Sequence, residues 1–555
     1  MSILFNLPAV LQAHLVCELL KLPDVVRLES ALCCKLFRAD FLAIVASPQS
    51  LFAYHMFEHD ESDARWVISR NVKFKSVHLF CGQITDKELN IELFLHLSCS
   101  ALESVYLSTY LNNHCDPADE QDIAIGAELF IMVLSSCCPN LTKFFVESNT
   151  MDTTISESLL VDLLSRCSKL KNIVLMNFNC GSNALLHALY TAPNLNHITL
   201  TGGSTPDRVQ DISLGLVNHK VTYLDCKEFT FTPGSDSNIS QICTRFPNLV
   251  SLEATDVSNL DLLALSQHCP LLQEITICVS EVIEEETALQ AARNWSHLRK
   301  LAMHRTNDPL PEFPDEDDIE VGESCTEAAL LCFIKHCLQL TYLNTVSRSS
   351  SYEQQFRRKA MGDCKTPRTT SLLYELYVDS LTINGFRHIF AWCKRLHILA
   401  IHHENPYLYD IETENLNERP LETALYGINK STIKILYVHN YTNLSGDCLK
   451  RLTGLQQINF SNVGSRKLDS NDILKLASRC PCLQKLSLHN CFPILDNFVL
   501  KLLDSCPTLT SLDIRNARAE NSYKRYTTSD QMLATLVGRV YPRMRNFHVD
   551  CQFFC

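Results

Sequence analysis

The sequence predicts an α/β fold in which one short strand and one helix alternate along most of the chain. The first observation is a phrase of the form L-x-x-L-x-L that follows the end of a predicted helix, as in CPCLQKLSL from Cys480 and CPTLTSLDI from Cys506. The second observation is the spacing: Cys480 and Cys506 are 26 residues apart, and so are Cys269 and Trp295. A regular period of this length is typical of a solenoid, in which each unit contacts only its neighbours.

Copies of the phrase extend over most of the chain. The clear copies begin at Cys138, Cys167, Ala192, Phe246, Cys269, Trp295, Cys393, Cys480, Cys506 and Tyr541. Weaker copies lie near Leu102, Val221, Leu340, Leu373, Ile433 and Leu455. Together they predict a leucine-rich-repeat solenoid of about 15 units, a horseshoe with parallel strands on its concave face and helices on its convex face.

Each unit also shows the two periods that a strand and a helix require. Ile473, Leu476 and Cys480 fall at positions i, i+3 and i+7, so one face of that helix points inward. In the strands, the leucines of the phrase point into the core and the residues between them point to the concave face. The expected central residues of the concave face are Phe145, Val174, Thr199, Glu253, Thr276, Ala302, Asn344, Ala400, Tyr437, Asn459, Ser487, Asp513 and His548. Small and neutral side chains dominate this set, which favours a protein segment over a phosphate backbone as the ligand.

The composition excludes several classes of protein. Hydrophobic residues make up 46% of the 555 residues and charged residues 20%, which is typical of a folded globular chain. The net charge of -13 argues against broad nucleic-acid binding. No run of 18 apolar residues predicts a transmembrane helix, and the N-terminal MSILFNLPAVLQAHLV lacks the basic start of a signal peptide. We therefore expect no membrane association.

Eight of the 26 cysteines follow the repeat, which argues against a disulfide framework. A small thiol packs well where a helix meets a strand, so we interpret the repeated cysteines as buried free thiols in a reducing compartment. This interpretation predicts a cytoplasmic or nuclear protein. Eight cysteines occupy the repeated position at the end of a helix: Cys99, Cys138, Cys167, Cys269, Cys337, Cys393, Cys480 and Cys506.

Five insertions interrupt the period, and each follows a strand, so all of them are expected on one rim of the solenoid. One insertion carries seven acidic residues from Glu312 to Glu323, and the next is basic. The two loops either attract each other as solvated segments or form a charged rim that docks a partner. The insertions lie near residues 108–122, 304–325, 347–369, 402–424 and 515–530, and the basic residues are Arg348, Arg357, Arg358, Lys359, Lys365 and Arg368.

Residues 1–60 contain no repeat and predict a helical hairpin. Leu7, Leu11, Leu15 and Leu19 recur every four residues, which indicates an amphipathic helix that begins at Pro8. Leu22-Pro23-Asp24 ends this helix, and Asp24 caps a second one. The second helix is lined by Val25, Leu28 and Leu32 and closed by the segment Cys34-Lys35-Leu36-Phe37. A hairpin of this size cannot bury so much apolar surface alone, so it requires a partner.

The order L-P-x-x-L, helix, L-P-D, helix, C-K-x-F resembles an F-box. With the repeats, the chain resembles the F-box/leucine-rich-repeat proteins of the cysteine-containing subclass. This resemblance divides the chain into an F-box-like domain (1–60) and a solenoid (72–555), and implies a Skp adaptor and a cullin–RING ubiquitin ligase as partners. It departs from the family pattern near the end of the F-box, where Leu36 or Phe37 stands in place of tryptophan. By position it assigns the adaptor contacts to Leu7, Pro8, Leu11, Leu15, Leu19, Leu28, Leu32, Cys34 and Phe37.

No motif for nucleotide binding, a serine nucleophile or a zinc site occurs in the sequence, so neither catalysis nor a cofactor or metal is expected. His304, His402, His439 and His489 do share one position of the repeat. His402 and His439 fall on adjacent strands, about 4.8 Å apart, so their rings could touch. They are either a metal-binding or proton-sensing pair, or two polar residues on a solvated face.

The sequence therefore predicts the substrate-recognition subunit of a Skp–cullin–F-box ubiquitin ligase, which binds an unidentified protein substrate through the concave face and the insertion rim. One alternative is a repeat scaffold with no role in ubiquitin transfer, and another is an unrecognised enzyme. Exposure of the Leu7–Leu19 stripe distinguishes a receptor from a scaffold, because an adaptor needs the stripe exposed. The expected partner contacts are Phe145, His402, Tyr437, His439, Arg357, Arg358 and Lys359.

Overall fold

The computed structural model has an α/β architecture and divides into two compact units, Met1–Asp256 and Val257–Cys555. In each unit the strands form an all-parallel sheet, and helices connect many of the successive strands. The structure describes residues 11–12, 15–16, 20, 22–31, 35–46, 51–52, 55–57, 61–80, 93–97, 100–109, 117–148, 156–176, 183–201, 217–226, 244–305, 325–346, 371–378, 381, 383–402, 432–441, 444, 446–449, 452–463, 468–491, 498–515 and 541–550.

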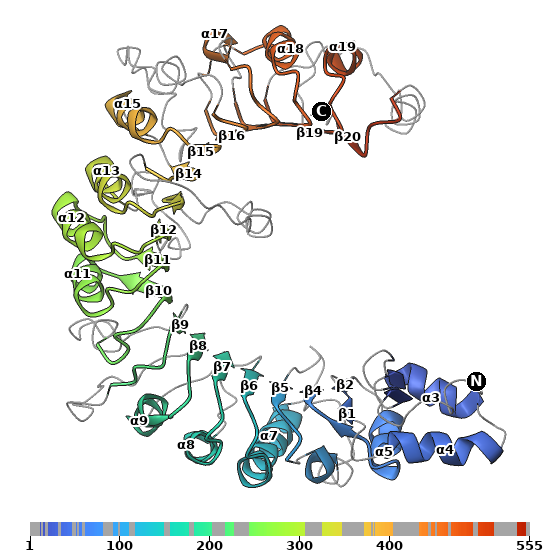
Figure 1. Cartoon of the computed structure of the whole chain (residues 1–555). Coiled ribbons are helices and arrows are strands. Elements are labelled where there is room, and N and C mark those ends of the chain that lie inside the picture. Colours follow the sequence, from blue (N-terminus) through green and yellow to red (C-terminus); the bar gives the residue numbers. More distant parts are fainter. Residues whose placement is uncertain are drawn as a thin grey trace. The chain divides into compact units, whose positions relative to one another are not determined.

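In the first unit the sheet follows the order β2-β4-β5-β6-β7-β8-β9-β10, and each strand is parallel to its neighbours. Helices α7, α8 and α9 lie on one side of this sheet (Figure 1). The elements are α3 (Leu22–Ala31), α4 (Lys35–Val45), β1 (Leu51–Phe52), β2 (His55–Phe57), α5 (Glu61–Ser69), β3 (Lys73–Phe74), β4 (Ser76–Phe80), β5 (Ser104–Thr109), α7 (Pro117–Cys137), β6 (Lys143–Ser148), α8 (Glu157–Arg166), β7 (Asn172–Met176), α9 (Asn183–Thr191), β8 (His197–Thr201), β9 (Tyr223–Cys226) and β10 (Ser251–Val257).

The second unit has the same arrangement, with parallel strands in the order β11 to β20. Its helices again lie on one side of the strands (Figure 1). The elements are α11 (Asn259–His268), β11 (Glu274–Val279), α12 (Glu285–Asn294), β12 (Lys300–Arg305), α13 (Glu327–His336), β13 (Tyr342–Asn344), β14 (Glu375–Val378), α15 (Ile383–Trp392), β15 (Ile398–His402), β16 (Ile435–His439), α17 (Gly446–Leu449), β17 (Gln457–Ser461), α18 (Ser470–Arg479), β18 (Lys485–His489), α19 (Phe498–Ser505), β19 (Ser511–Arg515) and β20 (Asn546–Asp550).

The L-x-x-L-x-L phrase suits a strand because its buried leucines alternate with less buried residues. In β18, Leu486 and Leu488 are buried, and the residues on either side of them are only partly buried. Leu486 pairs in register with Leu512, and Leu488 with Ile514, so apolar side chains of adjacent strands lie side by side. Each such buried side chain contributes about 1.5–3 kcal/mol to folding, which makes this register strongly preferred.

The prediction of buried thiols at the helix ends is confirmed for seven of the eight cysteines, and Cys99 lies outside the described residues. Several thiols also donate hydrogen bonds to backbone carbonyls of the preceding repeat. The Sγ of Cys167 lies 3.6 Å from the carbonyl oxygen of Cys138, and that of Cys480 lies 3.4 Å from the carbonyl of Leu452. These weak bonds connect the thiol of one repeat to the backbone of the repeat before it. Burial raises the pKa of Cys337 to about 12, so its thiol stays protonated at neutral pH.

Asparagine supplies the turn after three successive strands. Asn440, Asn462 and Asn490 follow β16, β17 and β18 and have φ angles of 57°, 53° and 49°. Asparagine tolerates this left-handed region better than most residues. The Nδ2 of Asn462 donates a hydrogen bond to the Oδ1 of Asn440 at 2.7 Å, so the side chains also connect neighbouring repeats.

The N-terminal region differs from the predicted two-helix hairpin. Lys35 does not close the second helix but begins another helix, α4, whose Phe41 and Val45 are buried. The apolar residues continue at helical spacing past Cys34, which explains the additional helix. The sheet also begins earlier than residue 72, because His55 in β2 pairs with Val77 in β4.

Most of the predicted insertions lie outside the described residues, namely 306–324, 347–369, 403–424 and 516–530, together with the acidic and basic residues assigned to them. The exception is the insertion near 108–122, whose residues 117–122 form the first turns of α7.

Candidate functional site

The side of each sheet opposite its helices is the candidate binding surface, and we name it the helix-free face because the described residues place no helix on it. Its side chains are those that alternate with the buried strand residues. In the first unit these are Ser76, His78, Phe80, Ser104, Tyr106, Ser108, Lys143, Phe145, Glu147, Asn172, Val174, Met176, His197, Thr199, Thr201, Tyr223, Asp225, Ser251 and Glu253.

The helix-free face of the second unit comprises Glu274, Thr276, Cys278, Lys300, Ala302, His304, Tyr342, Asn344, Glu375, Tyr377, Ile398, Ala400, His402, Ile435, Tyr437, His439, Gln457, Asn459, Ser461, Lys485, Ser487, His489, Ser511, Asp513, Arg515 and Asn546. The predicted central residues all fall in the register row expected of them. Thr199, Thr276, Ala302 and Asn344, however, are buried rather than exposed.

An aromatic stack occupies the start of the face in the first unit. His78, Tyr106 and Phe145 lie in register on β4, β5 and β6, with ring centroids 3.8 Å and 3.7 Å apart. Phe80 stacks on His78 from the same strand. The hydroxyl of Tyr106 donates to Glu147 at 2.8 Å. Burial in this stack lowers the pKa of His78 to about 4, so the imidazole is neutral at pH 7.

Carboxylates gather at the other end of this face. Asp225 and Glu253 lie directly opposite each other on β9 and β10. His197 stacks on Tyr223 at 3.9 Å, and the hydroxyl of Tyr223 lies 3.5 Å from Glu253. Burial lowers the pKa of His197, although the charge of Asp225 acts in the opposite direction. The two carboxylates therefore face a mainly neutral imidazole at pH 7.

The histidines of the second unit meet as the sequence predicts. His402 and His439 are in register, and their rings stack at 4.6 Å with planes 9° apart. The interpretation of both as solvated residues is wrong for His402, which is only 8% exposed, and His439 is partly buried. Burial, with smaller contributions from His402 and His489, lowers the pKa of His439 to about 4. His304 does not join the pair: it is buried, with its Nδ1 2.8 Å from the carbonyl oxygen of Val346.

Tyrosines surround a buried carboxylate on the same face. The hydroxyl of Tyr377 donates to Glu375 at 3.2 Å, and the rings of Tyr342 and Tyr377 lie 5.4 Å apart. Lys300 places its ammonium 5.7 Å from the centre of the Tyr342 ring. Burial raises the pKa of Glu375, and it raises that of Tyr437 to about 12 with a further contribution from the Glu375 charge. Sequence reasoning singled out Tyr437 but not Glu375 or Tyr377, although their positions in the repeat match the expected row.

Neither a metal site nor a membrane span is found in the part of the chain that the structure describes. No three His, Cys, Asp or Glu side chains of these residues are grouped so that they could hold a metal ion. Among the helices of this part, none combines the length and the apolar character needed to cross a bilayer.

The predicted partner contacts are divided between the two units. Phe145 belongs to the face of the first unit, whereas His402, Tyr437 and His439 belong to that of the second. The three basic residues Arg357, Arg358 and Lys359 lie outside the described residues.

Of the predicted adaptor contacts, Leu11 is 48% exposed, and Leu15 and Leu28 are partly buried. Phe37 lies in α4 rather than at the end of the second helix. Leu7, Pro8, Leu19, Leu32 and Cys34 lie outside the described residues.

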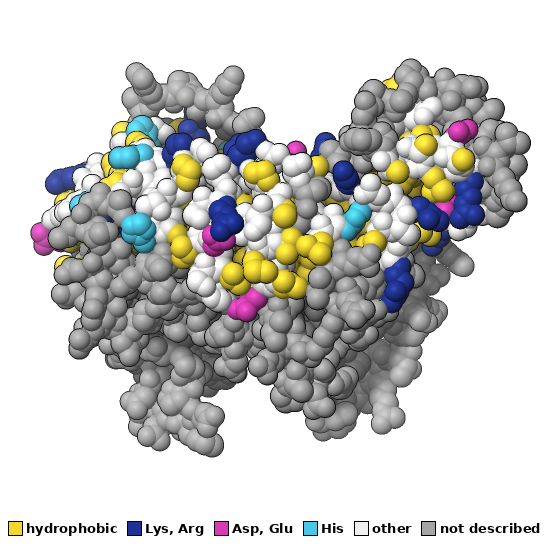
Figure 2. All heavy atoms as spheres, turned by 90° about the horizontal axis from the view of Figure 1, so that it is seen from below, with side chains coloured by type: hydrophobic (Ala, Val, Ile, Leu, Met, Phe, Trp, Pro, Cys, Tyr) yellow, Lys and Arg dark blue, Asp and Glu magenta, His cyan; other side chains and the backbone are white. Residues whose placement is uncertain are grey.

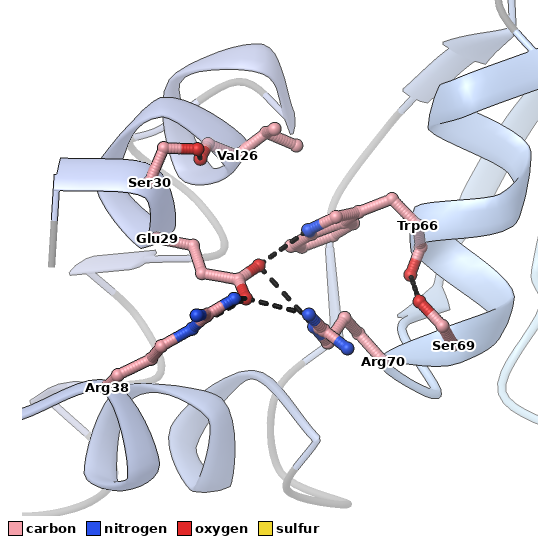
Figure 3. A network of polar contacts seen from close by, with 7 residues as sticks. All are labelled: Val26, Glu29, Ser30, Arg38, Trp66, Ser69 and Arg70. Carbon is pink, nitrogen blue, oxygen red and sulfur yellow. Dashed lines mark hydrogen bonds and ion pairs between the residues drawn. The ribbon is translucent and has the colours of Figure 1, made fainter. Parts of the chain in front are cut away.

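A buried ion network fixes the N-terminal helices to the start of the sheet (Figure 3). Glu29 on α3 is 4% exposed and lies at its centre. It accepts hydrogen bonds from Arg38 on α4 at 2.8 Å, from Trp66 on α5 at 2.6 Å, and from Arg70 just after α5 at 2.8 Å. Burial by itself raises the pKa of Glu29, but the bonds from Arg70, Arg38 and Trp66 outweigh it and lower the value to about 2.

The sequence contained no signal for this network, because its members span 41 residues and follow no repeat.

On the side of the first unit that carries the helices, hydrophobic side chains gather in the middle of the described surface (Figure 2). Leu95 and Met132 are exposed hydrophobic residues of the first unit.

Comparison with known proteins gave no matching family model and no matching curated protein.

Proposed function

We propose that the chain is a leucine-rich-repeat solenoid with an F-box-like N-terminal module, and that it is the substrate-recognition subunit of a Skp–cullin–F-box ubiquitin ligase. Three features support the solenoid: the L-x-x-L-x-L phrase, the consecutive order of the parallel strands, and the buried cysteine at the helix ends. The F-box-like module is supported by the L-P-x-x-L and L-P-D motifs and by helices at the N-terminus.

The exposure of Leu11 carries the adaptor proposal. Leu11 is 48% exposed and belongs to the predicted adaptor stripe, whereas Val16, five residues later, is buried. The Glu29 network holds α3 and α4 through polar contacts, so attachment of these helices does not require the Leu11 side chain. Single exposed leucines are common on protein surfaces, so the exposure of Leu11 supports the proposal through its place in the F-box-like stripe.

In this role the chain carries no catalytic residues. It holds a protein substrate on its helix-free faces and insertion rim and tethers that substrate near the ubiquitin-charged enzyme. Tethering raises the effective concentration of the substrate without any new chemistry. The expected compartment is the cytoplasm or the nucleus.

A pull-down of the full chain with a Skp adaptor tests the proposal. Leu11→Asp places a charge in the stripe, and we expect it to weaken adaptor binding at least about tenfold, since burying an unpaired charge costs more than 1.4 kcal/mol. Leu260→Asp is the matched control, because Leu260 is 73% exposed on α11 of the second unit. Equal binding by the two variants, or no binding by the unmodified chain, would overturn the proposal.

The second candidate is a repeat scaffold whose N-terminal helices only cap the open end of the sheet. The Glu29 network favours it, because a cap also needs firm attachment to α5. The same pull-down decides between the two functions: a scaffold does not bind the adaptor, and Leu11→Asp leaves its other interactions unchanged.

A further inference from the structure

Short segments lead into strands β4 to β10 of the first unit, and together they form one edge of its sheet. Their backbones pair in succession: the amide of Glu103 donates to the carbonyl of Lys75, that of Thr142 to Glu103, and that of Lys171 to Thr142, each at 2.8 Å. The same register continues to β10. We name this surface the strand-start edge, and it comprises residues 73–76, 101–104, 140–143, 169–172, 194–197, 220–223 and 248–251.

The strand-start edge is basic, although the chain as a whole has a net charge of -13. Glu103 is the one carboxylate among its residues, all of which the structure describes. Lys143, Lys171 and Lys220 are exposed. In the part of the chain that the structure describes, no ion pair joins Lys75, Lys143 or Lys171 to a carboxylate. The lysines of the edge are Lys73, Lys75, Lys143, Lys169, Lys171 and Lys220.

Two of these ammonium groups are held in place by asparagines. The Nδ2 of Asn140 donates to the carbonyl oxygen of Ser100 at 2.6 Å, and the Nζ of Lys169 donates to the Oδ1 of Asn140 at 2.6 Å. Asn194 and Lys220 repeat this arrangement two repeats later, with an Nζ–Oδ1 distance of 2.9 Å. An amide is neutral, so it positions the ammonium without cancelling its charge. Side chains that are already positioned lose less conformational entropy when a ligand binds.

We propose that the strand-start edge of the first unit binds an acidic protein segment, a run of aspartates and glutamates in an extended conformation. A row of lysines with a single carboxylate among them is complementary in charge to such a run. The edge borders the helix-free face and extends beyond it. The inference therefore adds a binding surface to the proposed ligase role and does not depend on that role.

The register of the strands sets the length of the acidic segment. Lys75 precedes β4 and Lys220 precedes β9, so five strand spacings separate them. Five spacings of about 4.8 Å amount to roughly 24 Å. An extended peptide covers that length in about seven residues. We therefore expect an acidic run of this length to contact the whole edge.

Two properties of the chain favour a protein segment over a nucleic acid. Single-stranded nucleic acids bind by stacking their bases on aromatic side chains. On the strand-start edge Phe74 is buried, and the rings of His197 and Tyr223 stack on each other. A duplex extends beyond the edge, where the net negative charge of the chain repels it, whereas a short acidic segment stays on the lysines.

Fluorescence anisotropy on the full chain tests the inference with a labelled peptide that carries seven alternating aspartates and glutamates between glycine–serine ends. One control peptide has lysines at the same positions, and a labelled single-stranded oligonucleotide with seven phosphates is a second control. We expect the acidic peptide to bind more tightly than either control, and its affinity to fall as salt is raised.

A charge-reversed variant localises the binding. Lys143→Glu with Lys171→Glu and Lys220→Glu should weaken binding of the acidic peptide at least about tenfold, because three ion pairs are lost and three repulsions replace them. The same variant should bind the lysine peptide, a gain that a misfolded chain cannot produce.

The matched control variant reverses three exposed lysines of the second unit, Lys335→Glu with Lys394→Glu and Lys501→Glu. It changes the net charge of the chain by the same amount, so it separates a local effect from a general one. We expect it to leave the affinity for the acidic peptide unchanged.

Three results would overturn the inference: no binding of the acidic peptide at millimolar concentration, equal weakening by the two triple variants, or binding of the oligonucleotide as tight as that of the peptide. Its failure is distinguishable from that of the ligase proposal. Adaptor binding without peptide binding leaves the ligase proposal intact, and peptide binding without adaptor binding leaves only the inference.

Discussion

The helix-free faces of the two units share one backbone plan and differ in chemistry. The first carries stacked aromatic rings and two carboxylates directly opposite each other, and the second carries paired imidazoles and tyrosines around Glu375. In both, the alternate residues are buried and are mostly leucine, isoleucine or valine. The difference teaches that the repeat fixes where a side chain points but leaves its chemistry free, so one face can specialise without disturbing the core.

Two ion pairs, one in each unit, differ in how deeply they are buried. In the first, Glu29 is enclosed by two arginines and a tryptophan and connects the N-terminal helices to α5. In the second, the ion pair between Arg515 and Asp513 lies on a partly exposed surface. Single substitutions measure how much each of these interactions contributes to stability.

The largest effect is expected from Glu29→Ala. Removing the carboxylate leaves Arg38 and Arg70 close together without their shared partner, which costs about 3 kcal/mol in a buried network. Hydrogen exchange should show lost protection in α3, α4 and α5 and no change in the second unit. Arg27→Ala is the matched control, because the Arg27–Asp24 pair of the same helix is solvent-exposed. Equal effects of the two substitutions would show that the network does not hold the helices.

A second prediction concerns acid stability and His78. Its pKa is about 4 in the folded chain and 6.5 ordinarily, so between these values the unfolded state binds more protons. The contribution of His78 to stability is therefore full above pH 6.5 and is lost as the pH falls towards 4. His78→Phe removes this dependence, and its unfolding free energy relative to the unmodified chain should rise by up to roughly 3 kcal/mol from pH 7 to pH 4. Urea unfolding at both pH values measures it; parallel pH profiles would contradict the prediction.

A smaller effect should show that the low pKa values of His78 and His439 have different causes. Burial alone lowers that of His78, whereas neighbouring imidazoles contribute at His439. His402→Asn should therefore raise the pKa of His439 and leave that of His78 unchanged. Titration of the imidazole resonances by NMR measures both values in one sample. A shift at both histidines, or at neither, would remove the proposed distinction between the faces.

The smallest effect is expected from Arg515→Ala. Arg515 donates from Nε and one terminal nitrogen to the two oxygens of Asp513, at 2.9 Å and 3.0 Å, but more than half of its side chain is exposed. Exposed pairs contribute about 0.5 kcal/mol, because solvent screens them. Thermal or urea unfolding should show a loss of that size, well below the loss from Glu29→Ala. A loss of several kcal/mol in unfolding free energy would show that water screens this ion pair less than its exposure indicates.

The repeats could be predicted in detail because their signal is local. A leucine every two or three residues and, in many copies, a cysteine at the helix end are visible within one repeat, and the spacing of about 26 residues between copies shows that the pattern recurs. The same regularity predicted that His402 and His439 share a row and touch. Their burial was not predictable, because it depends on the neighbouring strands and not on their own position in the repeat.

The N-terminal region lacks such repetition, and there the sequence misled. The helix from Lys35 to Val45 was mistaken for the end of its predecessor, and β2 was missed because three residues of strand carry too short a pattern to recognise. Glu29, Arg38, Trp66 and Arg70 meet only because three helices converge on one point.

By itself, then, the sequence determined the alternation of strand and helix, the parallel order, the buried cysteine position and the row in which each face residue lies. Only the tertiary structure decided which of these residues are buried, which charged side chains lie opposite each other, and how the N-terminal helices attach to α5. The physical reason is range: periodicity acts between residues a few positions apart, whereas burial and electrostatics depend on groups that the fold brings together from distant parts of the chain.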